Sequence, residues 1–143
     1  MPAVHPYITL KNTKEALEYY KEVLGATNID RLSLSEEKAK ELKLTKEQAD
    51  NITIYSQFDV LETTIMATDD LQNKNLAYNG ISILINIDST DKKIMKEAKN
   101  FWDHAVKSDD VVVDMSFGNH VESSELMGQF TDKYGISWVL RAK

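Results

Sequence analysis

The chain repeats one order of secondary structure, and this repeat constrains its fold more than any other feature. A short strand at 7–10 leads into an amphipathic helix at 12–24 and then into several strands. After Gly80 the order returns, with a strand at 81–87, a helix at about 90–107 and further strands. One such βαβββ unit makes a sheet with a helix on one face only, so its other face needs cover from a second unit. The second unit comes from the same chain or from a partner, and a pocket forms between the two.

The pattern predicts an α+β domain, 1–143, made of two modules at about 5–68 and 81–141. A charged stretch at about 35–50 has helical spacing and predicts an inserted excursion of one or two short helices. Asp59 and Val60 are expected to form a tight hairpin, and the polar segment 69–79 is expected to link the modules.

The strand at 81–87 shows strict alternation of side chains. One face is expected to carry Ile81, Ile83, Ile85 and Ile87. The other is expected to carry Ser82, Leu84 and Asn86. Four aligned β-branched residues would not be left in water, so the isoleucine face is expected under helices and the opposite face towards a pocket.

The composition of the chain excludes several kinds of partner and of chemistry. The net charge of −6 and pI of about 5.1 argue against a nucleic-acid or anionic membrane partner, because both require clustered Lys and Arg. The lysines at 38–46 alternate with glutamates and predict a solvated helix face. The lack of cysteine excludes thiol catalysis and disulfides. No signal-peptide pattern or membrane-length apolar run is present, so a cytoplasmic protein without a membrane partner is expected.

Four segments of the sequence match a known pattern. They are Pro6-Tyr7-Ile8, the helix from Glu15 to Ala26, Met66-Ala67-Thr68-Asp69, and the ending from Thr131 to Trp138. On these residues the chain resembles the vicinal oxygen chelate superfamily, which includes glyoxalase I and bleomycin-resistance proteins. More narrowly, it resembles the PhnB-like subgroup, over nearly the whole chain except the charged insert.

This resemblance implies paired βαβββ modules that form an incomplete barrel of mixed sheet with helices outside, commonly as a homodimer. In the enzymes of the superfamily, about four His, Glu or Gln side chains hold a divalent metal inside the barrel. The metal chelates two neighbouring substrate oxygens and stabilises developing enolate or oxyanion charge.

Carried onto this chain, the ligand positions of the family fall on His5, Met66, a position near Gly80, and Val139. One imidazole, one thioether and two positions without a donor cannot hold Mg, Mn, Ni or Zn. We therefore expect no stoichiometric metal cofactor and no classical metal-dependent glyoxalase activity. His5, with His120 and Glu122 from a loop before the last hairpin, is the weak remaining donor set.

Two classes of function follow from the resemblance. The first is binding of a small, mainly apolar organic molecule in the barrel cavity. The cavity would be lined by His5, Tyr7, Met66, Ser82, Leu84 and Val139. The alternative is a lyase, isomerase or dioxygenase, either metal-dependent or with a remodelled site. A third possibility is an interaction module with a vestigial pocket.

Two further residues are expected to have structural positions only. Trp138 alternates with Val139 and is expected to face the helix layer, and His104 is expected to be exposed.

Overall fold

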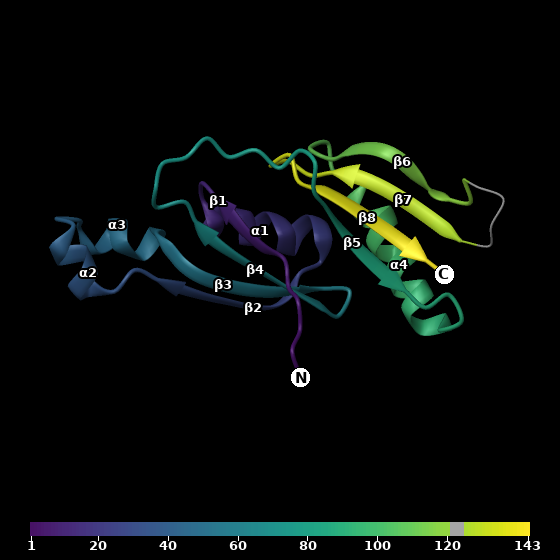
Figure 1. Ribbon diagram of the computed structural model, residues 1–143, viewed down its shortest axis with the longest axis horizontal. Helices are drawn as coiled ribbons and strands as arrows, with labels where there is room; N and C mark the ends of the chain where they lie inside the picture. The colour runs from purple at the N-terminus through teal and green to yellow at the C-terminus, as the bar shows by residue number, and fades with distance from the viewer. Residues whose placement is uncertain (121–124) are drawn as a thin grey trace. The chain divides into compact units, whose positions relative to one another are not determined.

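The computed structural model describes residues 1–120 and 125–143, which form two compact units, Met1–Leu76 and Ala77–Lys143. Each unit contains one βαβββ module built around a four-stranded mixed sheet (Figure 1). The α+β class and the duplicated module expected from the sequence are confirmed.

The first unit has the strand order β1-β4-β3-β2, with β1 parallel to β4 and the other pairs antiparallel. Its elements are β1 (Tyr7–Leu10), α1 (Thr13–Leu24), β2 (Thr27–Ser33), α2 (Glu36–Glu41), α3 (Lys46–Asn51), β3 (Thr53–Val60) and β4 (Thr63–Asp69). Figure 1 shows α1 lying along one face of this sheet. Among the described helices of this unit, none lies along the other face in Figure 1.

Capping residues set both ends of helix α1. The Asn12 side chain accepts a hydrogen bond from the Glu15 backbone N–H at 3.1 Å, and Gly25 ends the helix at a φ of 65°. The apolar stripe of the helix is buried, as expected. It comprises Ala16, Leu17, Tyr20, Val23 and Leu24. The Tyr20 ring stacks on Phe58 of β3 with centroids 5.3 Å apart, which packs the helix onto the sheet.

Asp69, at the end of β4, joins three parts of the first unit. One carboxylate oxygen accepts the backbone N–H of Thr13 at 2.7 Å, and the other accepts that of Thr53 at 2.9 Å. The first of these groups opens α1, where backbone N–H groups lack helical partners, and the second opens β3. Asp69 therefore fixes the helix against both central strands through charge-assisted hydrogen bonds.

The charged insert forms the two short helices α2 and α3, as the sequence predicted. The capping box of Thr45 and Gln48 is present in both directions. A small separate core holds the helices together, formed by Leu34, Ala39 and Ala49, with Leu44, Ile52 and Ile54 packed against it. The Leu34 N–H donates to the Ile52 carbonyl at 3.1 Å and closes the base of the insert.

The second unit repeats the arrangement without the insert. Its elements are β5 (Ser82–Ile87), α4 (Lys92–Ala105), β6 (Val112–Gly118), β7 (Leu126–Thr131) and β8 (Ser137–Ala142). The strand order is β5-β8-β7-β6, with β5 parallel to β8. Helix α4 covers one face of this sheet (Figure 1). Among the helices that the structure describes, none has the length and apolar character needed to cross a membrane.

Aromatic packing fills the space between α4 and its sheet. The Trp102 ring meets Phe117 and Phe130 with centroids 5.7 and 5.6 Å away. Gly128 makes this packing possible, because a Cβ there would lie 2.8 Å from the Phe117 Cα. Trp138 is 1 % exposed on the helix side, and the structural role expected for it is confirmed.

Asp132 organises the last hairpin. Its buried carboxylate accepts the backbone N–H groups of Tyr134 and Ile136 at 2.8 and 3.1 Å. It also accepts the indole N–H of Trp138 at 2.9 Å. Gly135, at a φ of 87°, supplies the left-handed turn residue that this hairpin needs.

An ion pair ties the start of β7 to the end of β8. The Arg141 guanidinium donates to both carboxylate oxygens of Glu125, at 2.8 and 3.2 Å, and Lys143 lies 3.6 Å from the same carboxylate. The hydrogen bond from Arg141, followed by the charges of Arg141 and Lys143, holds the pKa of Glu125 below its ordinary value.

Two local expectations were wrong. The hairpin between β3 and β4 turns at Leu61 and Glu62, not at Asp59 and Val60. Val60 is fully buried and stays in the strand, and the turn places Leu61 and Glu62 at φ values of 46° and 65°. Ile81 is 78 % exposed and precedes β5, so the helix-facing alternation begins only at Ile83.

We predict that Asp69→Ala lowers the free energy of unfolding by about 1–3 kcal/mol, because it leaves the backbone N–H groups at the start of α1 and of β3 without their acceptor. Asp69→Asn keeps one acceptor oxygen and is expected to lose less. Urea denaturation measures both. Asp30→Ala, an exposed aspartate on β2, is the matched control. Equal stability of Asp69→Ala and Asp30→Ala would contradict the bridging role.

We also predict a pH-dependent contribution from Glu125. A carboxyl whose pKa is lower in the folded state stabilises that state above its unfolded pKa, and the contribution disappears as pH falls through the folded value. The stability difference between the unaltered chain and Glu125→Gln is therefore expected at neutral pH and should shrink as the pH falls below the ordinary glutamate pKa of about 4.3. Urea titrations from pH 7 to pH 3 measure it. Glu18→Gln, an exposed helix position, should show no such convergence.

Candidate functional site

The uncovered face of the first sheet brings together Tyr7, Met66 and Gln57. Tyr7 of β1 lies beside Met66 of β4, and Met66 lies beside Gln57 of β3, so the three form one row across the sheet. The Tyr55 hydroxyl donates to the Gln57 side-chain oxygen at 2.7 Å and fixes that carboxamide. Tyr7 is 59 % exposed. This row offers an aromatic ring, a thioether and one polar anchor.

His5 lies two residues before β1 and is exposed. Its Nδ1 atom is 3.1 Å from the backbone oxygen of Thr64, which can only accept a hydrogen bond. Nδ1 therefore carries the proton in the neutral ring, and Nε2 keeps its lone pair. The strand residue next to Met66 is Tyr7 rather than His5, so the imidazole stands beside the row and not within it.

The uncovered face of the second sheet has two rows of interest. Leu84 of β5 lies beside Val139 of β8, and Val139 lies beside Gln129 of β7. In the next row Ser82 lies beside Ser137. The Ser82 and Ser137 hydroxyl oxygens lie 2.9 Å apart and share a hydrogen bond, and the Gln129 amide donates to the Ser137 oxygen at 2.7 Å.

Sequence reasoning included Ser82, Leu84 and Val139 but missed Gln129 and Ser137. The signal was present, because Ser137 precedes Val139 by two positions and a strand returns to the same face every second residue. The structure thus places the six expected lining residues in two sets. His5, Tyr7 and Met66 belong to the first sheet, and Ser82, Leu84 and Val139 belong to the second.

A divalent metal does not fit these residues. Among residues 1–120 and 125–143, no three His, Cys, Asp or Glu side chains gather closely enough to hold an ion. On the first sheet, an ion would meet the His5 imidazole, a thioether and a carboxamide. On the second it would meet hydroxyls, a carboxamide and aliphatic groups. Three or more convergent nitrogen or charged oxygen donors are needed for a catalytic site.

The other candidate donors lie elsewhere. The His120 Nε2 atom contacts the backbone oxygen of Ser116 in β6, the strand just before it, and the ring is exposed. Glu122 lies outside the described residues. His104 is exposed on α4, as expected.

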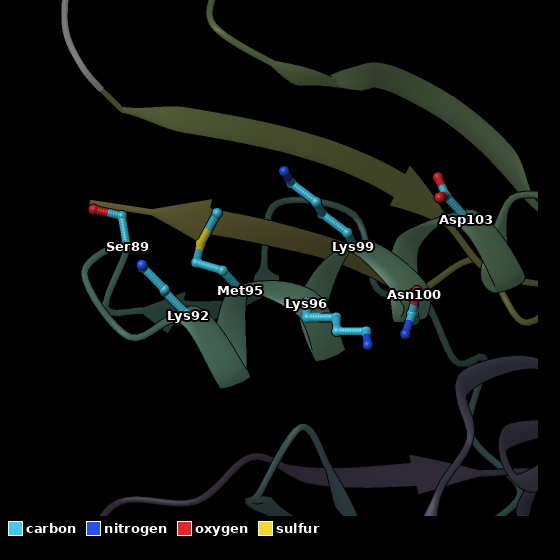
Figure 2. A pocket seen from close by; sticks show the side chains of 7 residues that line it. All are labelled: Ser89, Lys92, Met95, Lys96, Lys99, Asn100 and Asp103. Atoms are coloured by element: carbon cyan, nitrogen blue, oxygen red, sulfur yellow. The ribbon is translucent and has the colours of Figure 1, made fainter.

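Two hollows lie away from the sheet faces. One, of about 540 Å³, follows α4 and is lined by Ser89, Lys92, Met95, Lys96, Lys99, Asn100 and Asp103. Figure 2 shows that these side chains project from a single helix and the loop before it, with the lysine ends well separated. The other, in the insert, is about 170 Å³ and smaller than the roughly 300 Å³ of common ligand pockets. The sheet faces remain the better candidates.

Comparisons with known proteins agree with this architecture. The chain matches the family model of 3-demethylubiquinone-9 3-methyltransferase over residues 5–141. A search of the curated proteins found no match.

Solved structures share the fold at low identity. A Bacillus cereus protein titled as a putative 3-demethylubiquinone-9 3-methyltransferase and PhnB protein is 17% identical, with a TM-score of 0.61 over 99% of this chain and 100% of that one. The PA1353 protein of Pseudomonas aeruginosa is 21% identical, with a TM-score of 0.65 over 100% and 98%. The fosfomycin resistance protein FosX of Listeria monocytogenes is 15% identical, with a TM-score of 0.59 over 100% and 93%.

The family match spans both modules, and the paired βαβββ topology is the one found in these structures. The PhnB-like resemblance read from the sequence is thereby confirmed. The chain belongs to the 3-demethylubiquinone-9 3-methyltransferase family, whose model matches it over residues 5–141.

Proposed function

We propose that this chain binds a small, mainly apolar organic molecule on the uncovered faces of its sheets, without a metal. The observation that carries the proposal is the exposure of large apolar side chains there. Tyr7 is 59 % exposed and Leu84 is 50 % exposed, each beside a half-buried apolar neighbour, Met66 or Val139. Apolar surface with a few fixed polar groups is the usual composition of a small-molecule site.

The donor set disfavours the alternative, a metal-dependent lyase, isomerase or dioxygenase. Those reactions need convergent donors around an ion, and the described side chains of both sheet faces offer too few.

The methyl transfer named in the family description is also poorly supported. A cofactor of nucleotide type is commonly cradled by a glycine-containing turn between a strand and a helix. In this chain the turn before α1 and the turn before α4 contain no glycine, and the Asn12 and Asp91 side chains already cap those helices.

The proposal is tested with 2-ethylnaphthalene, an apolar fluorescent probe without hydrogen-bonding groups. Saturable binding is expected, and it should persist with EDTA present. Leu84→Asn is expected to weaken binding about fivefold, because it removes roughly half of the burial energy of a leucine. Leu71→Asn is the matched control, since Leu71 is 64 % exposed in the segment between β4 and β5.

Three results would contradict the proposal. The first is the absence of saturable binding to the unaltered chain. The second is binding that requires a divalent ion and is lost in EDTA, which would favour the metal-dependent alternative. The third is equal weakening by both leucine substitutions, which would show that the probe binds elsewhere.

We further propose that the protein is a cytoplasmic homodimer. Exposed apolar residues on the edge strands support association, among them Leu32 of β2 and Val112 of β6, which are 57 % and 62 % exposed. A cysteine-free chain is compatible with a reducing compartment. Sedimentation velocity at micromolar concentration is expected to give a species of twice the 16.3 kDa chain mass. A single 16.3 kDa species would contradict the dimer.

A further inference from the structure

The second sheet contains a cluster of hydrogen-bonded side chains that keeps one hydroxyl proton for a ligand. The Ser137 and Ser82 hydroxyl oxygens lie 2.9 Å apart and share a hydrogen bond, and the Gln129 amide donates to the Ser137 oxygen at 2.7 Å. Each hydroxyl has one proton, and the bond between the two serines uses only one of them. The Ser82–Ser137 pair therefore keeps one O–H that can donate to a ligand.

The surroundings hold this hydroxyl in place. Ser82 comes from β5, Ser137 from β8 and Gln129 from β7, so three adjacent strands meet at one oxygen atom. The two hydrogen bonds fix the Ser137 rotamer, and a hydroxyl that is already part of such a chain donates a stronger further bond. A donor fixed in advance loses little entropy when it binds a partner.

Apolar surface continues from this donor along the strands. Leu84 and Val139 follow Ser82 and Ser137 by two residues and therefore lie on the same face, about 7 Å further on. A molecule that reaches Ser137 with one atom thus extends its body over Leu84 and Val139.

We infer that the Ser82–Ser137 hydroxyl pair donates the hydrogen bond that orients the ligand, and that the ligand carries an acceptor oxygen of carbonyl type at one end of an apolar body. This inference rests on the proposed function, because it names the group that the same sheet face selects. The hydroxyl pair adds specificity more than affinity, since an analogue without the acceptor would leave the hydroxyl proton unpaired.

The test compares two probes of nearly equal shape, 2-acetylnaphthalene and 2-ethylnaphthalene, which differ by a carbonyl in place of a methylene. Ser137→Ala is expected to weaken binding of the acetyl probe about three- to tenfold and to leave the ethyl probe within twofold. Ser137→Thr keeps the hydroxyl and should retain the preference for the acetyl probe. Ser89→Ala, which removes a hydroxyl before α4, should change neither affinity.

The outcomes separate the two proposals. If the ethyl probe binds but Ser137→Ala changes the two affinities equally, or not at all, the role of Ser137 is wrong while the proposed function stands. If neither probe binds the unaltered chain, the proposed function fails and the inference fails with it. Thermal melting of each variant checks folding. If Ser137→Ala does not fold, loss of the acetyl preference in Ser137→Thr overturns the inference, and its retention there supports it.

Discussion

The structure depends on one constraint, which is that each four-stranded sheet has a single helix of its own module to cover it. Side chains of a strand alternate between two faces, so half of them pack under α1 or α4 and half do not. The covered halves contain the large buried aromatics, such as Phe58 and Trp138. The uncovered halves combine apolar side chains with a few fixed polar groups. The same alternation thus supplies both the core and the candidate site.

In each module, one buried or half-buried carboxylate accepts several hydrogen bonds from the surrounding chain. Asp69 accepts backbone N–H groups from the start of α1 and of β3, and Asp132 accepts two from the last hairpin together with the Trp138 indole. Hydrogen bonds to an ionised acceptor are stronger than neutral ones, and their loss would leave buried donors unsatisfied. Rigid strands matter for binding because hydroxyl and amide groups on the open faces then keep their positions before a ligand arrives.

Much of the fold could be predicted because its signals are local. Capping residues, the α1 stripe and the isoleucine alternation of β5 each identify an element from a short stretch. The β3–β4 turn was missed because Leu61 and Glu62 lack the Asn or Gly typical of a turn with positive φ. The candidate site was harder, because it depends on register between distant strands. Nothing local indicates that Gln129 reaches Ser137, or that Tyr7 rather than His5 lies beside Met66.

The insert between β2 and β3 has a consequence for how such a chain can change in evolution. Its helices pack on their own small core, and its two ends meet at the hydrogen bond between Leu34 and Ile52. Arg31 reinforces that junction by donating to the Asp50 carbonyl and to the Thr53 hydroxyl. A segment that starts and finishes at one point can be lengthened, shortened or exchanged at little entropic cost to the remaining chain. The β2–β3 junction is therefore a position at which members of this family can gain or exchange inserted residues while the sheets stay unchanged.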